Sequence, residues 1–123
     1  MLKVNQTMER LNIGILGSGF MGKMRSHAIK VVPTIFEDIQ VTPRLYAVAS
    51  IDDGIEAFAS RFGYSNYTND WWEVVEDPVV DVVMICTPEH LHEEMALAAL
   101  RAGKHVFCEK ALSLTLASCL KMF

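Results

Sequence analysis

The 123-residue chain has no long uninterrupted run of apolar residues and no cluster of basic ones. Its apolar residues make up 51% of the total but fall into short blocks, none near the ~18 consecutive residues of a transmembrane helix. The net charge is −4 and the 11 Lys and Arg residues are scattered, which removes the electrostatic basis for binding nucleic acid or an anionic membrane surface. We therefore expect neither nucleic acid nor a membrane as a partner.

Cysteine is also scarce. The three present are Cys86, Cys108 and Cys119, an odd number without the spacing of a metal site or a disulfide framework. We interpret Cys86 and Cys108 as small buried hydrophobes in a reducing compartment. Residues 1–11 lack the apolar centre of a secretory signal and are predicted to be a loose lead-in, with Met8 as an alternative start. These features favour a cytoplasmic protein whose residues 12–123 form one domain without a metal site.

Strand and helix patterns alternate along the chain. Pro33 is predicted to end the first helix. Asp52 or Asp53 is the predicted N-cap of the second helix, and Asn69 or Asp70 that of the third. This rhythm predicts an α/β fold with a doubly wound parallel sheet, in which the first and fourth strands flank the point where the strand order reverses. The predicted strands are residues 13–16, 44–49, 64–67, 79–86 and 105–108; the predicted helices are residues 21–32, 53–62, 71–75, 89–102 and 114–122, with a further helical turn at 36–39.

A glycine-rich turn, Gly-Ser-Gly-Phe-Met-Gly at residues 17–22, follows the first predicted strand and precedes the first helix. In this G-x-G-x-x-G pattern Gly17 permits a tight turn and Gly19 lets a pyrophosphate approach the backbone. Gly22 lets the helix pack closely, and the helix start offers free N–H groups to phosphates. The motif predicts dinucleotide binding; the alternative is a purely structural turn.

Two more polar clusters follow predicted strands. Residues 87–92 (TPEHLH) come after the fourth strand, and Glu109 and Lys110 come after the fifth. Ligands of open parallel sheets bind outside the carboxyl ends of the strands, so three clusters at one edge favour a single site. Taken alone, Lys110 would be a solvated surface lysine, and His90 and His92 would be surface or capping residues.

The motifs together resemble the nucleotide-binding half of the Gfo/Idh/MocA family, the group of glucose-fructose oxidoreductase and inositol dehydrogenase. The resemblance covers residues 11–123. It rests on IGILGSGFMG at residues 13–22 and on VVMICTPEHLHEEMALAALRAGKHVFCEKALSLTLA at residues 82–117. Family members carry T-P-N-x-x-H after the fourth strand of their Rossmann domain and A-G-K-H-V…E-K-P around the fifth.

The resemblance implies hydride transfer between NAD or NADP and a sugar, polyol or related alcohol or carbonyl. Lys110 would lie near the reacting oxygen, and Glu109 would hold the nicotinamide-side ribose. Residues beside the ribose and nicotinamide would be Thr87, Pro88 and His92. Residues lining the pyrophosphate would be Gly17, Ser18, Gly19, Phe20 and Met21, with Gly22 completing the turn.

The sequence departs from the family pattern at three points. Ala111 replaces the proline of E-K-P, so the orientation of Lys110 is expected to be less fixed than in the family. Glu89 replaces the asparagine of T-P-N. Family members also continue into a substrate domain, whereas this chain is expected to stop in the helix that leads to it. Residues 112–123 would then expose apolar side chains, which predicts self-association.

The choice of cofactor and the activity of the chain both stay open. Ser50 stands where an acidic residue would grip the adenine ribose, which leaves room for a 2′-phosphate; Ile51 offers no arginine, and Asp52 can reach the ribose instead. NAD and NADP both fit, with a slight preference for NADP through Ser50. One hypothesis is an oxidoreductase domain that has little activity alone; the alternative is a non-enzymatic, truncated relative that acts as a dinucleotide-binding or association module.

Overall fold

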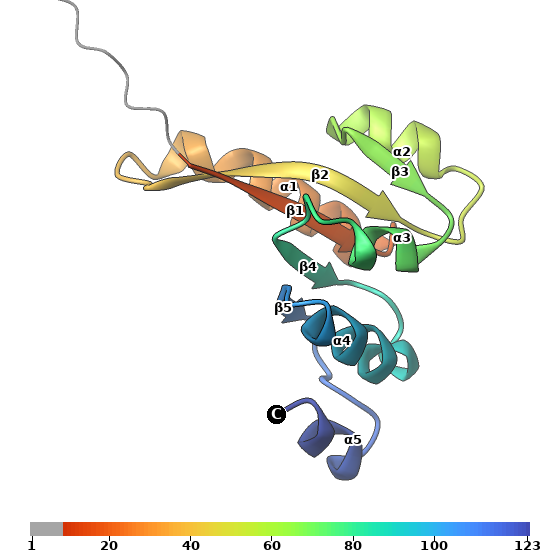
Figure 1. The fold of residues 1–123 in the computed structure, drawn as a ribbon. Helices are drawn as coiled ribbons and strands as arrows, with labels where there is room; N and C mark the ends of the chain where they lie inside the picture. Colours follow the sequence, from red (N-terminus) through yellow and green to blue (C-terminus); the bar gives the residue numbers. More distant parts are fainter. Residues whose placement is uncertain (1–8) are drawn as a thin grey trace, which may run out of the picture.

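The computed structural model describes residues 9–123 and shows one five-stranded, fully parallel sheet in the order β3-β2-β1-β4-β5 (Figure 1). The predicted doubly wound fold is therefore confirmed, with β1 and β4 adjacent where the order reverses. The strands are β1 Glu9–Leu16, β2 Val41–Ala49, β3 Asn66–Thr68, β4 Val82–Ile85 and β5 His105–Cys108. The helices are α1 Phe20–Ile35, α2 Ile55–Phe62, α3 Trp71–Glu76, α4 His92–Arg101 and α5 Leu116–Lys121, with a 3₁₀ turn η1 at Glu89–Leu91.

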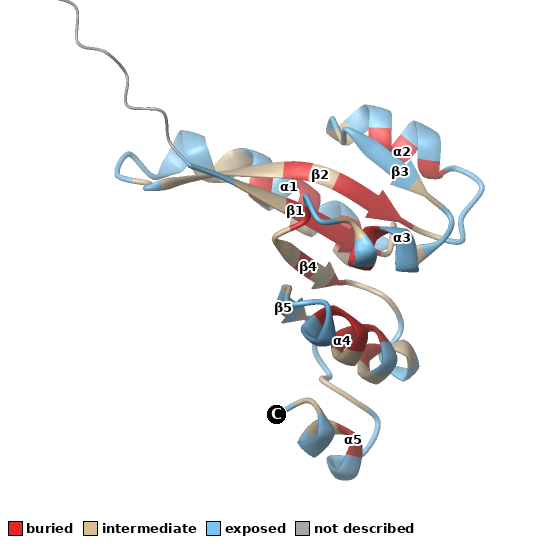
Figure 2. Cartoon of the chain, viewed as in Figure 1, coloured by how far each residue is buried: buried red, intermediate tan, exposed pale blue. Residues whose placement is uncertain are grey.

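Two apolar cores cover the two faces of the sheet, because successive strand residues point to opposite sides. On one face Ile13 and Ile15 of β1 pack with Ile29 of α1 and Phe58 of α2. On the other face Leu16 packs with residues of α3 and α4. Figure 2 shows the resulting band of buried residues along the centre of β1, β2 and α4. Strands buried on both faces explain why the sequence contains apolar blocks rather than alternation.

The first helix is longer than predicted. It runs through Pro33 to Ile35, so proline does not end it and no helical turn forms at residues 36–39. Pro33 lies in the last turn, where it removes only one backbone hydrogen bond, and the helix still closes with Phe36 N–H donating to Val32 O at 3.1 Å. Pro43 is likewise tolerated inside β2, because β3 pairs only with Ala47–Ala49 and leaves that part of β2 at an edge.

The fourth strand is shorter than predicted. It begins at Val82 because residues 77–80 form a turn, in which the Asp77 carboxylate accepts from Val79 N–H at 2.8 Å and Asp77 O accepts from Val80 N–H at 3.2 Å. The following helix is divided into η1 and α4, and the second helix begins at Ile55 with Gly54 as its cap, not Asp52 or Asp53.

Other local predictions are confirmed. Asp70 caps α3, with its carboxylate accepting from Trp72 N–H at 3.0 Å. Gly63 ends α2 in the left-handed conformation, at φ 82°. Strand β5 has the predicted bounds, and β1 begins four residues earlier than predicted, so part of the expected lead-in belongs to the sheet; residues 1–8 lie outside the described residues.

The last helix, α5, lies beside α4 and away from the sheet (Figure 1). Glu93 of α4 holds it by accepting from the Ser118 hydroxyl and from Lys121 Nζ, the latter at 3.1 Å. Thr115 caps the helix by accepting from Ser118 N–H at 3.1 Å. Hydrogen bonds to Glu93 and the packing of Met122, at the end of α5, against the core therefore place α5 on α4.

Candidate functional site

The loops after β1, β4 and β5 all begin at the same level of the sheet, because backbone pairing continues into each loop. Gly17 N–H donates to Ala49 O at 2.8 Å and Cys86 N–H donates to Leu16 O at 2.8 Å. Glu109 N–H donates to Ile85 O at 3.0 Å. The three polar clusters predicted from the sequence thus share the carboxyl edge of the sheet, at the reversal of strand order.

The glycine turn has the geometry that its sequence predicts. Gly17 has φ 108°, and a Cβ there would lie 2.6 Å from Cys86 O. A Cβ on Gly22 would lie 2.2 Å from Gly17 O, so the helix packs directly on the turn. At Gly19 a Cβ would meet no atom within 4 Å, so this backbone faces open space. Gly17 and Gly22 are therefore required by the fold, whereas Gly19 leaves room for a ligand.

The start of α1 is a strong donor site. Gly19 is the N-cap, no side chain caps the helix, and no acidic residue lies in its first turn. The first helical backbone bond is made by Lys23 N–H to Gly19 O at 3.0 Å. The N–H groups of Phe20, Met21 and Gly22 therefore have no partner within the helix and point, with the positive end of the helix dipole, at the open space.

Polar groups at the end of β2 adjoin this turn. The Ser18 hydroxyl donates to Ser50 Oγ at 2.7 Å, and Ser50 Oγ also accepts from Asp52 N–H at 3.2 Å. Asp52 Oδ1 accepts from Gly54 N–H at 3.0 Å, and the Asp52 side chain is exposed. The predicted adenine-ribose residues therefore lie next to the glycine turn, already ordered by local hydrogen bonds.

The TPEHLH segment divides into exposed and buried residues. Pro88 is exposed and Thr87 is half-buried, with its hydroxyl donating to Met95 Sδ at 3.3 Å. His92, by contrast, is fully buried, and its ring nitrogens lie against backbone carbonyl oxygens of Thr87 and Ala111. The site residues Thr87 and Pro88 border the carboxyl edge, whereas the His92 side chain stands behind it.

An ion pair that the sequence analysis did not identify lies beside β5. Arg25 of α1 donates through Nε to Glu109 at 2.5 Å, and its guanidinium lies 4.9 Å from the centre of the Phe107 ring. Glu109 is buried, and Arg25 holds the pKa of its carboxyl below the usual range, chiefly through this hydrogen bond. Glu109 is therefore a carboxylate, fixed in position and able to accept further hydrogen bonds. The only sequence signal for the pair was an arginine one turn into the helix that follows the glycine motif.

Lys110 is exposed at the same edge, immediately after Glu109, and its backbone N–H helps to lower the pKa of the Glu109 carboxyl. The peptide bond between Lys110 and Ala111 is cis. Burial raises the pKa of the nearby Cys86 thiol to about 12 and that of Cys108 to about 11. These two cysteines are half-buried thiols packed against the cores, close to the prediction of small hydrophobes.

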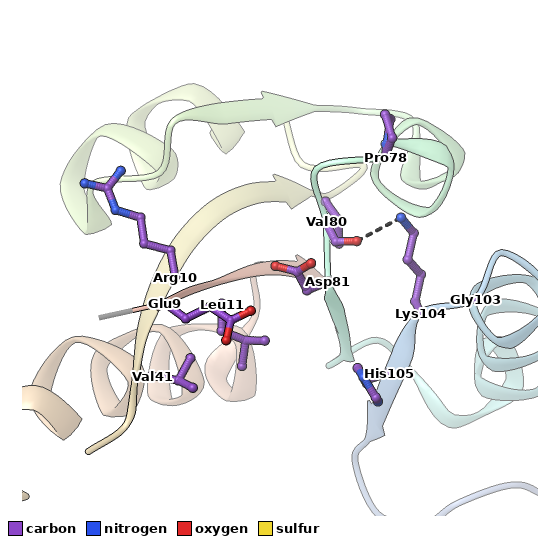
Figure 3. Close-up of a pocket in the computed structure, with 10 residues that line it drawn as sticks. All are labelled: Glu9, Arg10, Leu11, Val41, Pro78, Val80, Asp81, Gly103, Lys104 and His105. Carbon is purple, nitrogen blue, oxygen red and sulfur yellow. Dashed lines mark hydrogen bonds between the residues drawn. The ribbon is translucent and has the colours of Figure 1, made fainter. Parts of the chain in front are cut away.

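A cleft of about 430 Å³ lies at the opposite, amino-terminal edge of the sheet (Figure 3). Two of the polar side chains that line it are paired within the protein: Lys104 Nζ donates to Asp77 O at 2.6 Å and to Val80 O at 2.8 Å, and Asp81 accepts from Asn12 N–H at 2.8 Å. Within residues 9–123, no three His, Cys, Asp or Glu side chains gather where they would hold a metal ion. In the same part of the chain, no helix is both long enough and apolar enough to cross a membrane.

The parallel sheet, the glycine turn at the strand reversal and the uncapped helix start together define a dinucleotide-binding Rossmann domain. Residues 11–123 match the family model of the Gfo/Idh/MocA group, described as an oxidoreductase family with an NAD-binding Rossmann fold. The chain belongs to this family.

Similar proteins place this domain within longer enzymes. A levoglucosan dehydrogenase from Pseudarthrobacter phenanthrenivorans is 44% identical over 109 residues, 88% of this chain and 28% of the relative. A myo-inositol 2-dehydrogenase from Thermotoga maritima is 33% identical over 108 residues, 87% of this chain and 30% of the relative.

Solved structures agree with this placement. A levoglucosan dehydrogenase in complex with NADH and L-sorbose has a TM-score of 0.90 at 41% identity, covering 94% of this chain and 31% of that one. An NAD-binding oxidoreductase from Klebsiella pneumoniae has a TM-score of 0.88 at 45% identity, covering 92% of this chain and 30% of that one. The chain thus spans about a third of the length of the relatives it matches.

Proposed function

We propose that this chain is the cofactor-binding part of a sugar or polyol dehydrogenase, and that it binds NAD at the carboxyl edge of its sheet. The observation that carries the proposal is the uncapped start of α1 facing open space at Gly19. Three unpartnered N–H groups and the helix dipole suit the pyrophosphate of a dinucleotide. The substrate class follows from the named activities of the relatives, levoglucosan and inositol dehydrogenases.

The predicted site residues that border the carboxyl edge have the following roles in this proposal. Ser18 and Met21 flank the pyrophosphate, with Phe20, 73% exposed, forming an apolar wall. Thr87 and Pro88 border the nicotinamide side. Glu109, held as a carboxylate by Arg25, accepts hydroxyl hydrogen bonds from the ribose. The bound nicotinamide supplies a hydride acceptor or donor.

Lys110 is the residue that we assign to the reacting oxygen. It is exposed and follows the ribose-binding Glu109 directly. An ammonium there can stabilise the alkoxide character of an alcohol that loses its hydride, or polarise a carbonyl that gains one. The role is that of an electrostatic catalyst and needs a substrate held beside it.

Local charges at the end of β2 favour NAD over the NADP that the sequence analysis preferred. Ser50 leaves space for a 2′-phosphate, but its hydroxyl is engaged by Ser18. The following residues are Ile51, Asp52 and Asp53, which bring two carboxylates and no cation. A 2′-phosphate carries additional negative charge, so these carboxylates would repel it, whereas the exposed Asp52 can accept from a free 2′-hydroxyl.

Titration calorimetry with NADH and with NADPH tests both the binding of a dinucleotide and the preference for NAD over NADP. We expect saturable binding of NADH and weaker binding of NADPH. Asp52→Asn should narrow the difference between them, and Glu37→Gln, a charge change in the exposed loop after α1, serves as the control. Absence of heat and of a thermal shift with either nucleotide at millimolar concentration would disprove dinucleotide binding. Tighter binding of NADPH would restore the preference based on Ser50.

Self-association is a second proposal, favoured by the apolar side chains of the C-terminal segment. Leu116, Leu120 and Phe123 are 75%, 64% and 98% exposed. An apolar patch of this kind is unusual on a monomer and is stabilised by burial against another surface. We expect a concentration-dependent sedimentation coefficient that Leu116→Ser together with Leu120→Ser abolishes. A strictly monomeric parent chain would rule the association out.

A further inference from the structure

His92 is the largest polar side chain among the fully buried residues of the described part of the chain, with 0% of its surface exposed. It begins α4, directly after the 3₁₀ turn η1. Histidine is seldom fully buried without hydrogen-bond partners, because an unpaired ring nitrogen loses its hydration without compensation. Its surroundings therefore indicate what it does.

Both ring nitrogens of His92 lie against main-chain oxygens of two different loops. Nε2 is 2.9 Å from Thr87 O, at the end of β4, while Nδ1 is 2.9 Å from Ala111 O and 3.3 Å from Leu112 O, beyond β5. The carbonyl oxygens only accept, so each short contact needs an N–H on the ring. A neutral imidazole donates to one loop at a time, and a doubly protonated ring donates to both.

The two loops that the ring joins both belong to the candidate site. Thr87 adjoins the nicotinamide side, and Ala111 directly follows Lys110. Apart from the contacts of His92, the hydrogen bonds of residues 111–113 in the structure include only the Ser113 hydroxyl with Ser118 on α5. Between the end of β5 and Ser113, the carbonyl oxygens of Ala111 and Leu112 are therefore held by the buried His92 ring.

We propose that His92 is a positioning residue for Lys110: its imidazole bridges Thr87 O and Ala111 O and sets the distance between the loops after β4 and β5. His92 contacts neither the cofactor nor the substrate in this scheme, which differs from its predicted place beside the nicotinamide. The proposal rests on the proposed function for the role of Lys110. The bridge itself is a property of the chain without any ligand.

Nuclear magnetic resonance of the chain without cofactor tests the bridge. The ring N–H of His92 should exchange slowly with water, as a buried, hydrogen-bonded proton does, and its ¹⁵N shift should show which ring nitrogen carries it. The amides of residues 110–113 should be ordered, with order parameters near about 0.85, a value typical of rigid backbone. Mobile amides in the parent chain, with order parameters below about 0.6, would overturn the proposal at once.

Two substitutions separate hydrogen bonding from packing. His92→Phe keeps a ring in place without any N–H, and His92→Gln keeps an amide N–H that can donate to one carbonyl. We expect residues 110–113 to become mobile in His92→Phe and to keep most of their order in His92→Gln, while β1 and β4 stay ordered in both. His90→Ala, on the exposed neighbouring turn, is the control and should change nothing. Full order of the segment in His92→Phe would show that the ring only fills space.

The affinity for NADH separates this proposal from the proposed function. If the ordered segment is a binding-competent state, His92→Phe should weaken NADH binding about threefold to tenfold, in proportion to the fraction of chains that lose the competent arrangement. A parent chain that binds no nucleotide but shows the loss of order in His92→Phe would keep the bridge and disprove the proposed function. Nucleotide binding together with unchanged order in His92→Phe would disprove the bridge alone. If His92→Phe does not fold, His92→Gln decides, with His90→Ala as its control. Residues 110–113 that keep their order in His92→Gln, together with a slowly exchanging ring N–H of His92 in the parent, support the bridge. A ring N–H in the parent that exchanges rapidly with water overturns it.

Discussion

The amino-terminal and carboxyl edges of the sheet differ in how their polar groups are hydrogen-bonded within the protein. At the amino-terminal edge, a cleft of about 430 Å³ has Lys104 in its wall, with Nζ already donating to two carbonyl oxygens, and Asp81, whose carboxylate already accepts from Asn12 N–H (Figure 3). At the carboxyl edge the start of α1 is uncapped, the backbone at Gly19 is open and Lys110 is exposed. Lys104 and Asp81 at the amino-terminal edge are thus engaged within the protein, whereas the start of α1 at the carboxyl edge has N–H donors without acceptors in its own helix.

Under the proposed function, hydrogen-bonding capacity rather than concavity distinguishes the cofactor site from the cleft. A backbone N–H group that lacks a protein partner binds water until a ligand replaces it. The N–H groups at a helix start also carry the positive end of the dipole, so an anionic ligand gains more there than water does. Paired groups such as Lys104 offer no such gain, and their removal affects stability.

The largest expected effect concerns catalysis and tests whether the carboxyl edge suffices alone. We expect little or no turnover from the isolated chain, because orientation of the substrate against the nicotinamide is worth roughly 7–11 kcal/mol of the barrier and no second domain surrounds Lys110 in the described residues. The assay follows the absorbance of reduced nicotinamide with sugars, inositols and small aldehydes. Robust turnover that Lys110→Ala removes would show that this half is enough.

Gly19→Val is expected to block the open space in front of the start of α1 at the carboxyl edge. Gly19 has φ −73° and ψ −164°, which valine can adopt, and its Cβ would meet no protein atom within 4 Å. The fold should therefore be kept, while NADH affinity should fall at least about 100-fold, or about 2.8 kcal/mol, because the side chain occupies the space of the pyrophosphate. Calorimetry and thermal unfolding measure the two quantities. Unchanged affinity would reduce the glycine motif to a structural turn.

Lys104→Met, at the amino-terminal edge, is expected to lower the stability of the fold while leaving the affinity for NADH unchanged. It removes the Lys104 donor from Val80 O and leaves Asp77 O with only the Val80 N–H, so the free energy of unfolding should fall by about 1–2 kcal/mol. NADH affinity should stay within twofold of the parent value, or about 0.4 kcal/mol. Lys30→Met, an exposed change on α1, is the matched control. A substantial loss of affinity in Lys104→Met would end the distinction between the two edges.

The smallest expected effect is the pH dependence of the pair between Arg25 and Glu109. Because Arg25 lowers the pKa of Glu109 in the folded state, the pair stabilises the fold above the ordinary carboxyl pKa of about 4.3, and this contribution is lost as the pH falls through the lower folded value. Arg25 is partly exposed, so we expect Arg25→Met to cost no more than about 1 kcal/mol at pH 7.

Urea unfolding at several pH values measures this contribution, with the exposed Arg101→Met as the control. The difference between the parent and Arg25→Met should shrink as the pH falls below about 4, where Glu109 becomes protonated in the unfolded chain. A difference that grows toward acid pH would contradict the assigned direction of the pKa shift.

The elements that the sequence predicts best are those whose signals are local. The glycine turn, the cap at Asp70 and the end of α2 at Gly63 depend on backbone preferences within a few residues, and all three are present. Predictions failed at the ends of elements, where a single residue shifts the boundary. Pro33 stays in α1 because it lies in the last turn and removes only one backbone hydrogen bond, and Val79 and Val80 leave the strand because Asp77 accepts from their N–H groups.

In the candidate site, too, some features could be predicted from the sequence and others depend on the tertiary structure. The sequence alone determined that G-x-G-x-x-G and two other polar clusters follow strands of one parallel sheet and therefore share its carboxyl edge. Only the tertiary structure decided which of these side chains are exposed at that edge and which are buried behind it. His92 turns inward onto two carbonyl oxygens, and Arg25, distant from Glu109 in sequence, fixes its charge. The physical reason is that spacing sets which strand end a residue occupies, whereas hydrogen bonds between separate loops depend on how the whole sheet brings them together.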